Sequence, residues 1–173
     1  LMTKTTKPPW VSRTPFFYGW VILAVASLAG FMSGPGQTYG VSVFVDPMIK
    51  SLGLSRTLIA GLYASGSLTA AALMIVVGRL LDRYGARTVL VVVTALFGIA
   101  LLWMSNVDNP MELYLGFAGI RTFGQGSLGL IPTTLLALWF VRKRGRVMPF
   151  FFAGSAVSQA LFPPLIHRLT TEL

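Results

Sequence analysis

The sequence predicts an all-α membrane protein with five transmembrane helices. Hydrophobic residues make up 54% of the chain, charged residues only 11%, and the mean hydropathy is +0.73. A soluble domain carries about 25% charged residues. The few charges are also segregated, because they leave five long stretches without any charged residue. About 20 apolar residues are enough to span the hydrocarbon core of a bilayer, and each of the five stretches reaches that length.

The five helices are predicted at about 16–45, 57–79, 88–106, 112–140 and 147–167. Residues 1–15 form a tail, and residues 16–173 form the transmembrane bundle. The charge-free run Thr14–Val45 would extend about 48 Å as one straight helix, which is longer than a span needs. Gly34-Pro35-Gly36 lies inside this run, and proline removes a backbone donor and clashes with the preceding turn. The sequence therefore predicts a kink in the first helix.

The basic residues predict the orientation of the bundle. Ten of the fourteen lie in the tail or next to the second-to-third and fourth-to-fifth connections: Lys4, Lys7, Arg13, Arg79, Arg83, Arg87, Arg142, Lys143, Arg144 and Arg146. Three lie on the other side: Lys50, Arg56 and Arg168. The positive-inside rule then places the N-terminus in the cytoplasm of a multi-pass protein of the plasma (inner) membrane. A lipid bilayer is the expected partner, and nucleic acid is not, because the basic residues are divided among short connections.

Several chemistries are disfavoured by composition. The chain has no cysteine and one histidine, His167, near a helix end. It has no Ser/His/Asp set, no paired carboxylates within a span and no phosphate-binding loop. We therefore expect neither an enzyme nor a cofactor or metal site.

A charged motif joins the second and third predicted helices: Gly78-Arg79-Leu80-Leu81-Asp82-Arg83-Tyr84-Gly85-Ala86-Arg87. Gly78 would allow two helices to approach closely, and Gly85 suits a tight turn with positive φ. Asp82 lies beside Arg83 and Arg87, which predicts a compact charge cluster. The alternative is a solvated basic loop in which the aspartate is incidental.

This motif resembles the loop between the second and third helices of the major facilitator superfamily. Gly78, Asp82, Arg83, Gly85 and Arg87 match the family pattern, whereas Ala86 stands where the family often has a basic residue. The resemblance implies a secondary transporter whose loop acts as a gating latch on the cytoplasmic side. It also implies that this chain is a fragment: five helices of a six-helix N-terminal bundle, with the C-terminal half of the protein missing.

Further segments resemble one branch of that superfamily, the oxalate/formate antiporters and monocarboxylate transporters. The segments are Phe17-Tyr18-Gly19-Trp20-Val21, Trp139-Phe140-Val141-Arg142-Lys143-Arg144-Gly145-Arg146, and Gly154-Ser155 with Phe162-Pro163-Pro164. The aromatic entry has an alternative explanation as an interfacial belt.

Three-helix inverted repeats, which occur in this superfamily, make the first and fourth helices equivalent. The first carries Gly34, Pro35 and Gly36, and the fourth carries Gly124 and Gly126. We expect both to be bendable helices along a central path. Coincidence is the alternative, because glycine is common in membrane helices.

Arg121 is the main candidate for function. A charge at the centre of a span costs about 2.5–3.5 kcal/mol on insertion scales, and every acidic residue falls in a loop or at the end of a predicted span. Arg121 would bind an anionic substrate or an acid outside this chain, bond backbone carbonyls of the first helix, or snorkel to the interface. Uncharged polar residues form a candidate substrate site with it: Gln37, Tyr39, Tyr63, Gln125 and Gln159, beside Thr38 and Ser155. Helix-to-helix hydrogen bonding is the alternative for each.

The sequence thus favours an alternating-access transporter of small organic anions such as monocarboxylates or dicarboxylates. A proton-coupled exporter or a carrier of neutral solutes would use the same fold. A non-transporting scaffold of five helices is the third interpretation.

Overall fold

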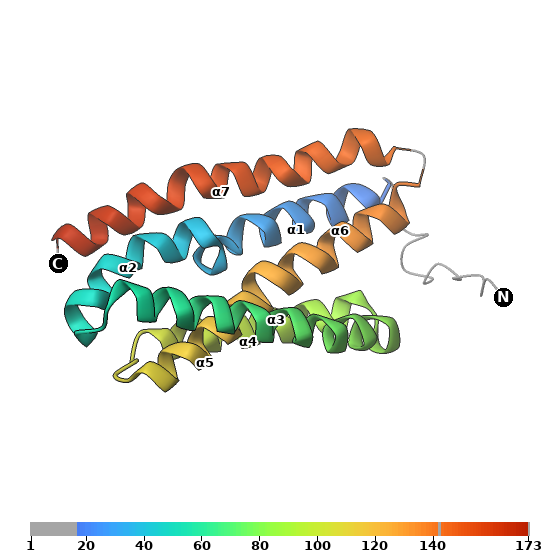
Figure 1. Cartoon of the computed structure of the whole chain (residues 1–173). Coiled ribbons are helices and arrows are strands. Elements are labelled where there is room, and N and C mark those ends of the chain that lie inside the picture. Colours follow the sequence, from blue (N-terminus) through green and yellow to red (C-terminus); the bar gives the residue numbers. More distant parts are fainter. Residues whose placement is uncertain (1–16, 142, 173) are drawn as a thin grey trace.

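The computed structural model describes residues 17–141 and 143–172, and this part of the chain forms helices and no strand (Figure 1). The elements are α1 (Gly19–Met32), η2 (Gly34–Gly36), α2 (Thr38–Leu52), α3 (Arg56–Tyr84), α4 (Ala86–Met104), α5 (Pro110–Ile120), η3 (Arg121–Ser127), α6 (Leu128–Trp139) and α7 (Arg144–Glu172). The all-α prediction is confirmed. The predicted tail, residues 1–15, lies outside the described residues.

Three helices of the described chain are long and apolar enough to cross a membrane: α3, α4 and the Arg144–Ile166 part of α7. The other two predicted spans are interrupted. The first consists of α1, the 3₁₀ turn η2 and α2, and the fourth consists of α5, the π-helical η3 and α6. Figure 1 shows α7 running beside α1 and α2, with α6 next to them and α3 on the far side.

Two apolar cores hold these helices together. The larger core joins α3, α4, α5 and α6 through residues such as Phe97, Leu113 and Phe117. The smaller core joins α1, α6 and α7 through Leu23, Phe140 and others. The fourth predicted span (α5, η3 and α6, called helix four below) contributes to both cores, so the remaining helices pack against it.

The break in helix one is repaired by α7. Pro35 has no N–H, so the Phe31 carbonyl four residues earlier lacks its usual helical donor. The Ser158 hydroxyl, which belongs to α7 and is completely buried, donates to that carbonyl at 2.8 Å. The predicted kink at Gly34-Pro35-Gly36 is therefore present, and it also fixes the position of α7.

The break in helix four lies against the break in helix one. In η3 the Ser127 hydroxyl donates to the Thr122 carbonyl at 2.8 Å, and both residues are buried. A Cβ at Gly36 would lie 2.9 Å from the Ile120 carbonyl oxygen and 3.0 Å from the Cα of Gly124. The two interrupted helices therefore cross backbone to backbone, and only glycine fits at Gly36.

The charged motif is a helix–turn–helix junction and not a loop. Residues 78–84 form the end of α3 and Ala86 begins α4, so Gly85 alone separates the helices. Its φ of 78° confirms the predicted positive φ. A Cβ at Gly78 would meet open space, so the close helix approach expected there does not occur within the described chain.

The charge cluster expected at this motif is not formed either. Asp82 is exposed, and the ion pair found within the described residues is Arg56–Asp46, at the other end of the bundle. Arg83 instead lies over the ring of Tyr84, with 5.4 Å between the guanidinium carbon and the ring centroid.

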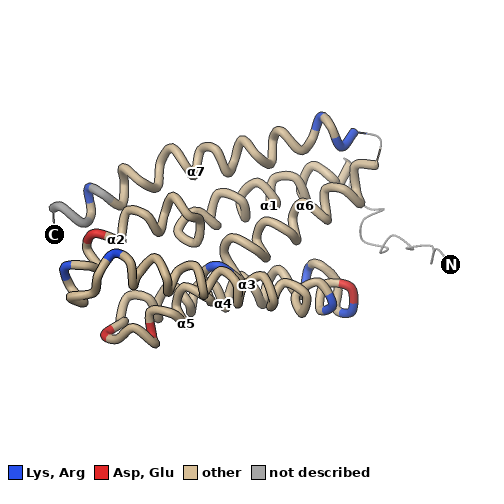
Figure 2. Tube along the Cα trace, in the orientation of Figure 1, with Lys and Arg blue, Asp and Glu red and all other residues tan. Residues whose placement is uncertain are grey.

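Figure 2 shows that charged residues gather at the two ends of the bundle, with one basic position midway along helix four, in η3. That position is Arg121, the first residue of η3. The middle of the bundle is otherwise uncharged in the described chain.

Gly36→Ala is expected to lower the melting temperature of the detergent-solubilised protein, because the added methyl group meets backbone atoms that have no room to move. Gly98→Ala is the matched control: its Cβ would meet nothing within 4 Å in the middle of α4. The control should be neutral or stabilising, since glycine in a helix interior costs about 0.5–1 kcal/mol relative to alanine. Equal shifts for the two variants in thermal unfolding would contradict the glycine crossing.

Ser158→Ala is expected to destabilise the protein by about 1–3 kcal/mol, because it removes the buried hydroxyl that donates to the Phe31 carbonyl at the break. Ser65→Ala is the control, since that hydroxyl bonds only to the Leu62 carbonyl of its own helix. Denaturant or thermal unfolding of both variants measures the difference. A Ser158 variant as stable as the control would show that the carbonyl finds another partner.

Candidate functional site

Two cavities flank the point where helix one resumes after its break. The residues Gln37 and Tyr39 line a cavity of about 410 Å³ together with α6 and α7. Thr38, between them in sequence, lines a different cavity of about 310 Å³ against α3 and α5. Neighbouring residues of a helix point in different directions, so a single turn of α2 contributes to both cavities.

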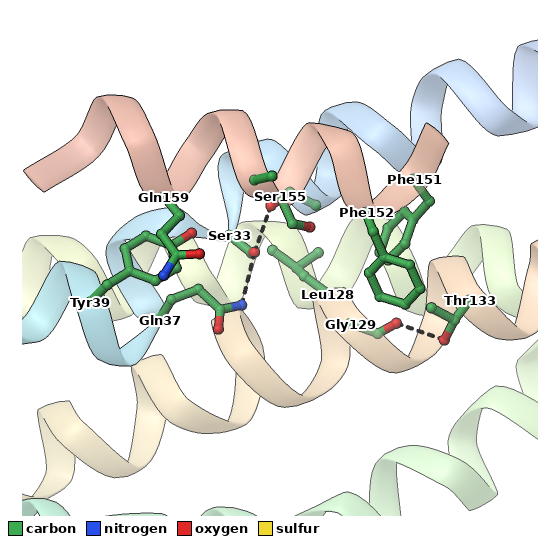
Figure 3. Close-up of a pocket in the computed structure, with 12 residues that line it drawn as sticks. Ser33, Gln37, Tyr39, Leu128, Gly129, Thr133, Phe151, Phe152, Ser155 and Gln159 are labelled. Atoms are coloured by element: carbon green, nitrogen blue, oxygen red, sulfur yellow. Dashed lines mark hydrogen bonds between the residues drawn. The ribbon is translucent and has the colours of Figure 1, made fainter. Parts of the chain in front are cut away.

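The first cavity is lined without any charged residue (Figure 3). Its polar side chains are Ser33, Gln37, Tyr39, Thr133, Ser155 and Gln159, and its aromatic side chains include Phe151 and Phe152. The Gln37 amide donates to the Ser33 hydroxyl at 3.1 Å, and that hydroxyl donates to the Gly30 carbonyl at 2.8 Å. The cavity offers amides and hydroxyls for neutral hydrogen-bonding groups and aromatic surface for apolar ones.

A relay of hydrogen bonds connects this cavity to the break in helix one. The Tyr39 hydroxyl donates to the Ser158 hydroxyl at 2.9 Å, and Ser158 donates to the Phe31 carbonyl. Tyr39 is also a lining residue of the cavity. This wall residue therefore bonds to the same hydroxyl that repairs the helix.

Arg121 belongs to a separate cluster on the α3 side. Its guanidinium donates to the Thr38 hydroxyl at 3.2 Å, and the Tyr63 hydroxyl donates to the same oxygen at 3.1 Å. The guanidinium carbon lies 4.9 Å from the centroid of the Tyr63 ring, a cation–π contact. Thr38 belongs to α2, Tyr63 to α3 and Arg121 to η3, so three separate elements supply the cluster.

The cluster distinguishes among the roles expected for Arg121. The arginine does bond to helix one, but to the Thr38 hydroxyl and not to a backbone carbonyl. Within the described residues it has no ion-pair partner. Since arginine has five N–H donors, most of its donors are left for another acceptor, and the partly buried position keeps that acceptor close to the bundle interior.

The second cavity lies beside this cluster and reaches toward the far end of the bundle. Thr38 and Tyr63 line it together with Arg56, and its remaining walls are mainly apolar. Arg56 is exposed and paired with Asp46. The cavity therefore has a basic residue at its rim and a second one, Arg121, bonded to its wall through Thr38.

The six predicted substrate residues do not gather in one cavity. Gln37, Tyr39 and Gln159 share the uncharged cavity, whereas Tyr63 and Arg121 form the cluster with Thr38. The amide oxygen of Gln125, in η3, is buried without a hydrogen-bond partner in the described chain. A buried acceptor of this kind is costly unless a donor arrives.

Sequence analysis missed Ser33 and Ser158. Both are buried, and both accept a hydrogen bond from a residue that lines the uncharged cavity. A signal for Ser158 existed, because Pro35 implies an unpaired carbonyl at Phe31 and a buried donor somewhere nearby. No local pattern indicated which helix would supply that donor.

The known proteins to which this chain is similar in sequence are named as transporters or as an efflux protein. The chain is 30% identical over 95 residues to MFS-type transporter 1 of an Ophiocordyceps species, covering 55% of this chain and 21% of that protein. It is 27% identical over 94 residues to the fujikurins efflux protein of Gibberella fujikuroi, covering 54% and 20%. It is 30% identical over 121 residues to a probable L-galactonate transporter of Escherichia coli, covering 69% and 26%.

The chain thus spans between about a fifth and a quarter of the length of these curated relatives. No solved structure matches it. The family model described as the Major Facilitator Superfamily, whose members are transporters and not enzymes, matches residues 20–173. With apolar membrane-length helices and a match over most of its length, the chain is that of a membrane protein belonging to the major facilitator superfamily.

Proposed function

We propose that this protein is a secondary active transporter of small organic anions, such as monocarboxylates or dicarboxylates, that works by alternating access. The observation that carries the proposal is Arg121, a partly buried cation midway along the bundle without an ion-pair partner among the described residues. Ionisable residues at such positions mark substrate or ion pathways. Interrupted helices beside the substrate site are also a feature of secondary transporters.

A carboxylate would accept hydrogen bonds from the donors of Arg121 that Thr38 does not use. Thr38 supplies one neutral acceptor to Arg121 and to Tyr63. A carboxylate offers two acceptor oxygens and pairs with guanidinium in a bidentate geometry, which is stronger than a bond to a neutral hydroxyl. Substrate would therefore exchange with Thr38 as the acceptor for Arg121, and the Tyr63 hydroxyl is placed to donate to the same anion.

The uncharged cavity gives this proposal a second component. Gln37 and Gln159 provide amides for hydroxyl or carbonyl groups of a substrate longer than formate. The relative named as a probable L-galactonate transporter supports an organic anion that carries hydroxyl groups. The proposed branch, close to the oxalate/formate antiporters and monocarboxylate transporters, rests on the sequence resemblance.

The proposed setting is the plasma (inner) membrane with the N-terminus in the cytoplasm, as the positive-inside rule indicates. The proposed partners are the bilayer, the anionic substrate and a C-terminal half that completes the transport path. Asp82 and Arg83, exposed at the end of α3, would contact that half as a gating latch.

A carrier or proton-coupled exporter of neutral compounds is the second candidate. The specific observation in its favour is the uncharged lining of the 410 Å³ cavity, with Phe151 and Phe152 on its wall. The relative named as a fujikurins efflux protein agrees with export. Family membership disfavours the non-transporting scaffold, since the other members are transporters.

Arg121→Ala is expected to reduce uptake of radiolabelled oxalate, formate, lactate, pyruvate or galactonate at least about tenfold, from the loss of a charged hydrogen bond. The measurement uses proteoliposomes that contain the full-length protein. Arg121→Lys should retain part of the uptake, because it keeps the charge but loses the bidentate geometry. Arg79→Ala, an exposed arginine at the bundle end, is the control.

Near-normal uptake by the Arg121→Ala protein at equal reconstitution would refute the assigned role. If none of these anions enters although the protein is folded, the neutral-solute candidate takes precedence.

Asp82→Asn is expected to lower the maximal rate of transport more than it raises the half-saturating substrate concentration, because a latch acts on conformational cycling and not on substrate contacts. Asp108→Asn is the matched control, an exposed aspartate at the opposite end of the bundle. Initial rates over a range of substrate concentrations separate the two parameters. Equal maximal rates for the Asp82 variant and the parent would count against the latch.

A further inference from the structure

A third cavity, of about 590 Å³, lies between α1, α4 and α6. None of its lining residues lines either candidate substrate cavity. Most of its wall is aliphatic: Val21, Ile22, Val25, Ala26, Leu90, Pro132 and Leu135. Its volume falls within the range of about 300–1,000 Å³ that is usual for pockets of small ligands.

The remaining lining residues are polar or aromatic and lie at one end of this cavity. They are Tyr18 just before α1, Arg87 at the start of α4, and Trp139 at the end of α6. These three helix ends lie at the end of the bundle where α7 begins (Figure 1), and they line the same cavity. The cavity is therefore amphipathic along its length, with a cationic aromatic end and an aliphatic interior.

Arg87 gives the polar end an affinity for anions. It is exposed and makes no hydrogen bond or ion pair with any described residue. It is also the second residue of α4, whose N-cap, Gly85, has no side chain to accept the first amides. A helix N-terminus favours negative charge, so the guanidinium and the uncapped first turn attract an anion together.

We propose that this cavity binds one anionic glycerophospholipid, with its phosphate at Arg87 and an acyl chain along α1 and α6. The aliphatic wall matches the acyl chain, and Trp139 is the last residue of α6, the kind of helix end where aromatic side chains meet headgroups. From Tyr18 to Ala26 the α1 wall extends about 12 Å, enough for part of an acyl chain. A soluble anion would leave the aliphatic wall unexplained, and an uncharged lipid would leave Arg87 unexplained.

The surrounding charge agrees with an anionic ligand. Arg79, Arg83, Lys143 and Arg144 lie at the same end of the bundle. Basic residues beside a membrane attract anionic lipids by about 1 kcal/mol each. This general attraction concentrates such lipids near the cavity, whereas the site itself depends on Arg87.

The test measures how brominated acyl chains quench the fluorescence of Trp139 in proteoliposomes that contain the full-length protein. Trp10, Trp20 and Trp103 are replaced by Phe, so Trp139 is the reporter within this chain. Brominated phosphatidylglycerol should quench Trp139 half-maximally at a mole fraction about fivefold lower than brominated phosphatidylcholine does, as about 1 kcal/mol predicts.

Arg87→Gln should abolish this preference for the anionic lipid. Arg79→Gln should preserve it, because Arg79 is an exposed arginine at the same end that does not line the cavity. Val25→Phe, at a lining position that is 47% exposed, should reduce quenching by both lipids because the ring fills the path of the acyl chain.

Three results would overturn the proposal. An equal loss of preference in the Arg79 and Arg87 variants would assign it to general surface charge. Equal quenching by the two lipids in the parent protein would remove the anionic site. A Trp139 that neither lipid quenches would mean that polypeptide covers the cavity. None of these outcomes depends on which substrate is transported.

Discussion

A helix that breaks inside an apolar environment must find new partners for the backbone groups it releases, since no water is available there. Pro35 imposes this requirement on helix one, and the Ser158 hydroxyl meets it from α7. The same break leaves room for Gly36 to lie against Gly124, where the π-helical part of helix four passes. The positions of α7 and of helix four relative to helix one both follow from this repair.

The repaired break also determines how polar side chains are distributed. Helix one resumes at Thr38, and the residues around this point turn toward two different cavities. Tyr39 belongs to the wall of one cavity and to the hydrogen-bond relay that repairs the break. The side chain of a cavity wall residue and the geometry of the break are consequently coupled through the Ser158 hydroxyl.

Electrostatics separates the ends of the bundle from its middle. Charged side chains are inexpensive at the ends, where water and headgroups solvate them, and costly midway. Arg121 is retained midway because Thr38 and the Tyr63 ring stabilise its guanidinium. Arg87, in contrast, faces an aliphatic cavity at a bundle end. The proposed anion transport depends on Arg121, and the proposed lipid site depends on Arg87.

The sequence by itself determined the all-α class, the break at Gly34-Pro35-Gly36, the positive φ at Gly85 and the family. Each depends on hydropathy over one helix length or on the local chemistry of proline and glycine. Only the tertiary structure decided which residues meet, because the bond from Arg121 to Thr38 joins positions 83 apart and that from Tyr39 to Ser158 joins positions 119 apart. It also decided that the charged motif closes in a one-residue turn with Gly78 unpacked, since such contacts depend on how whole helices pack.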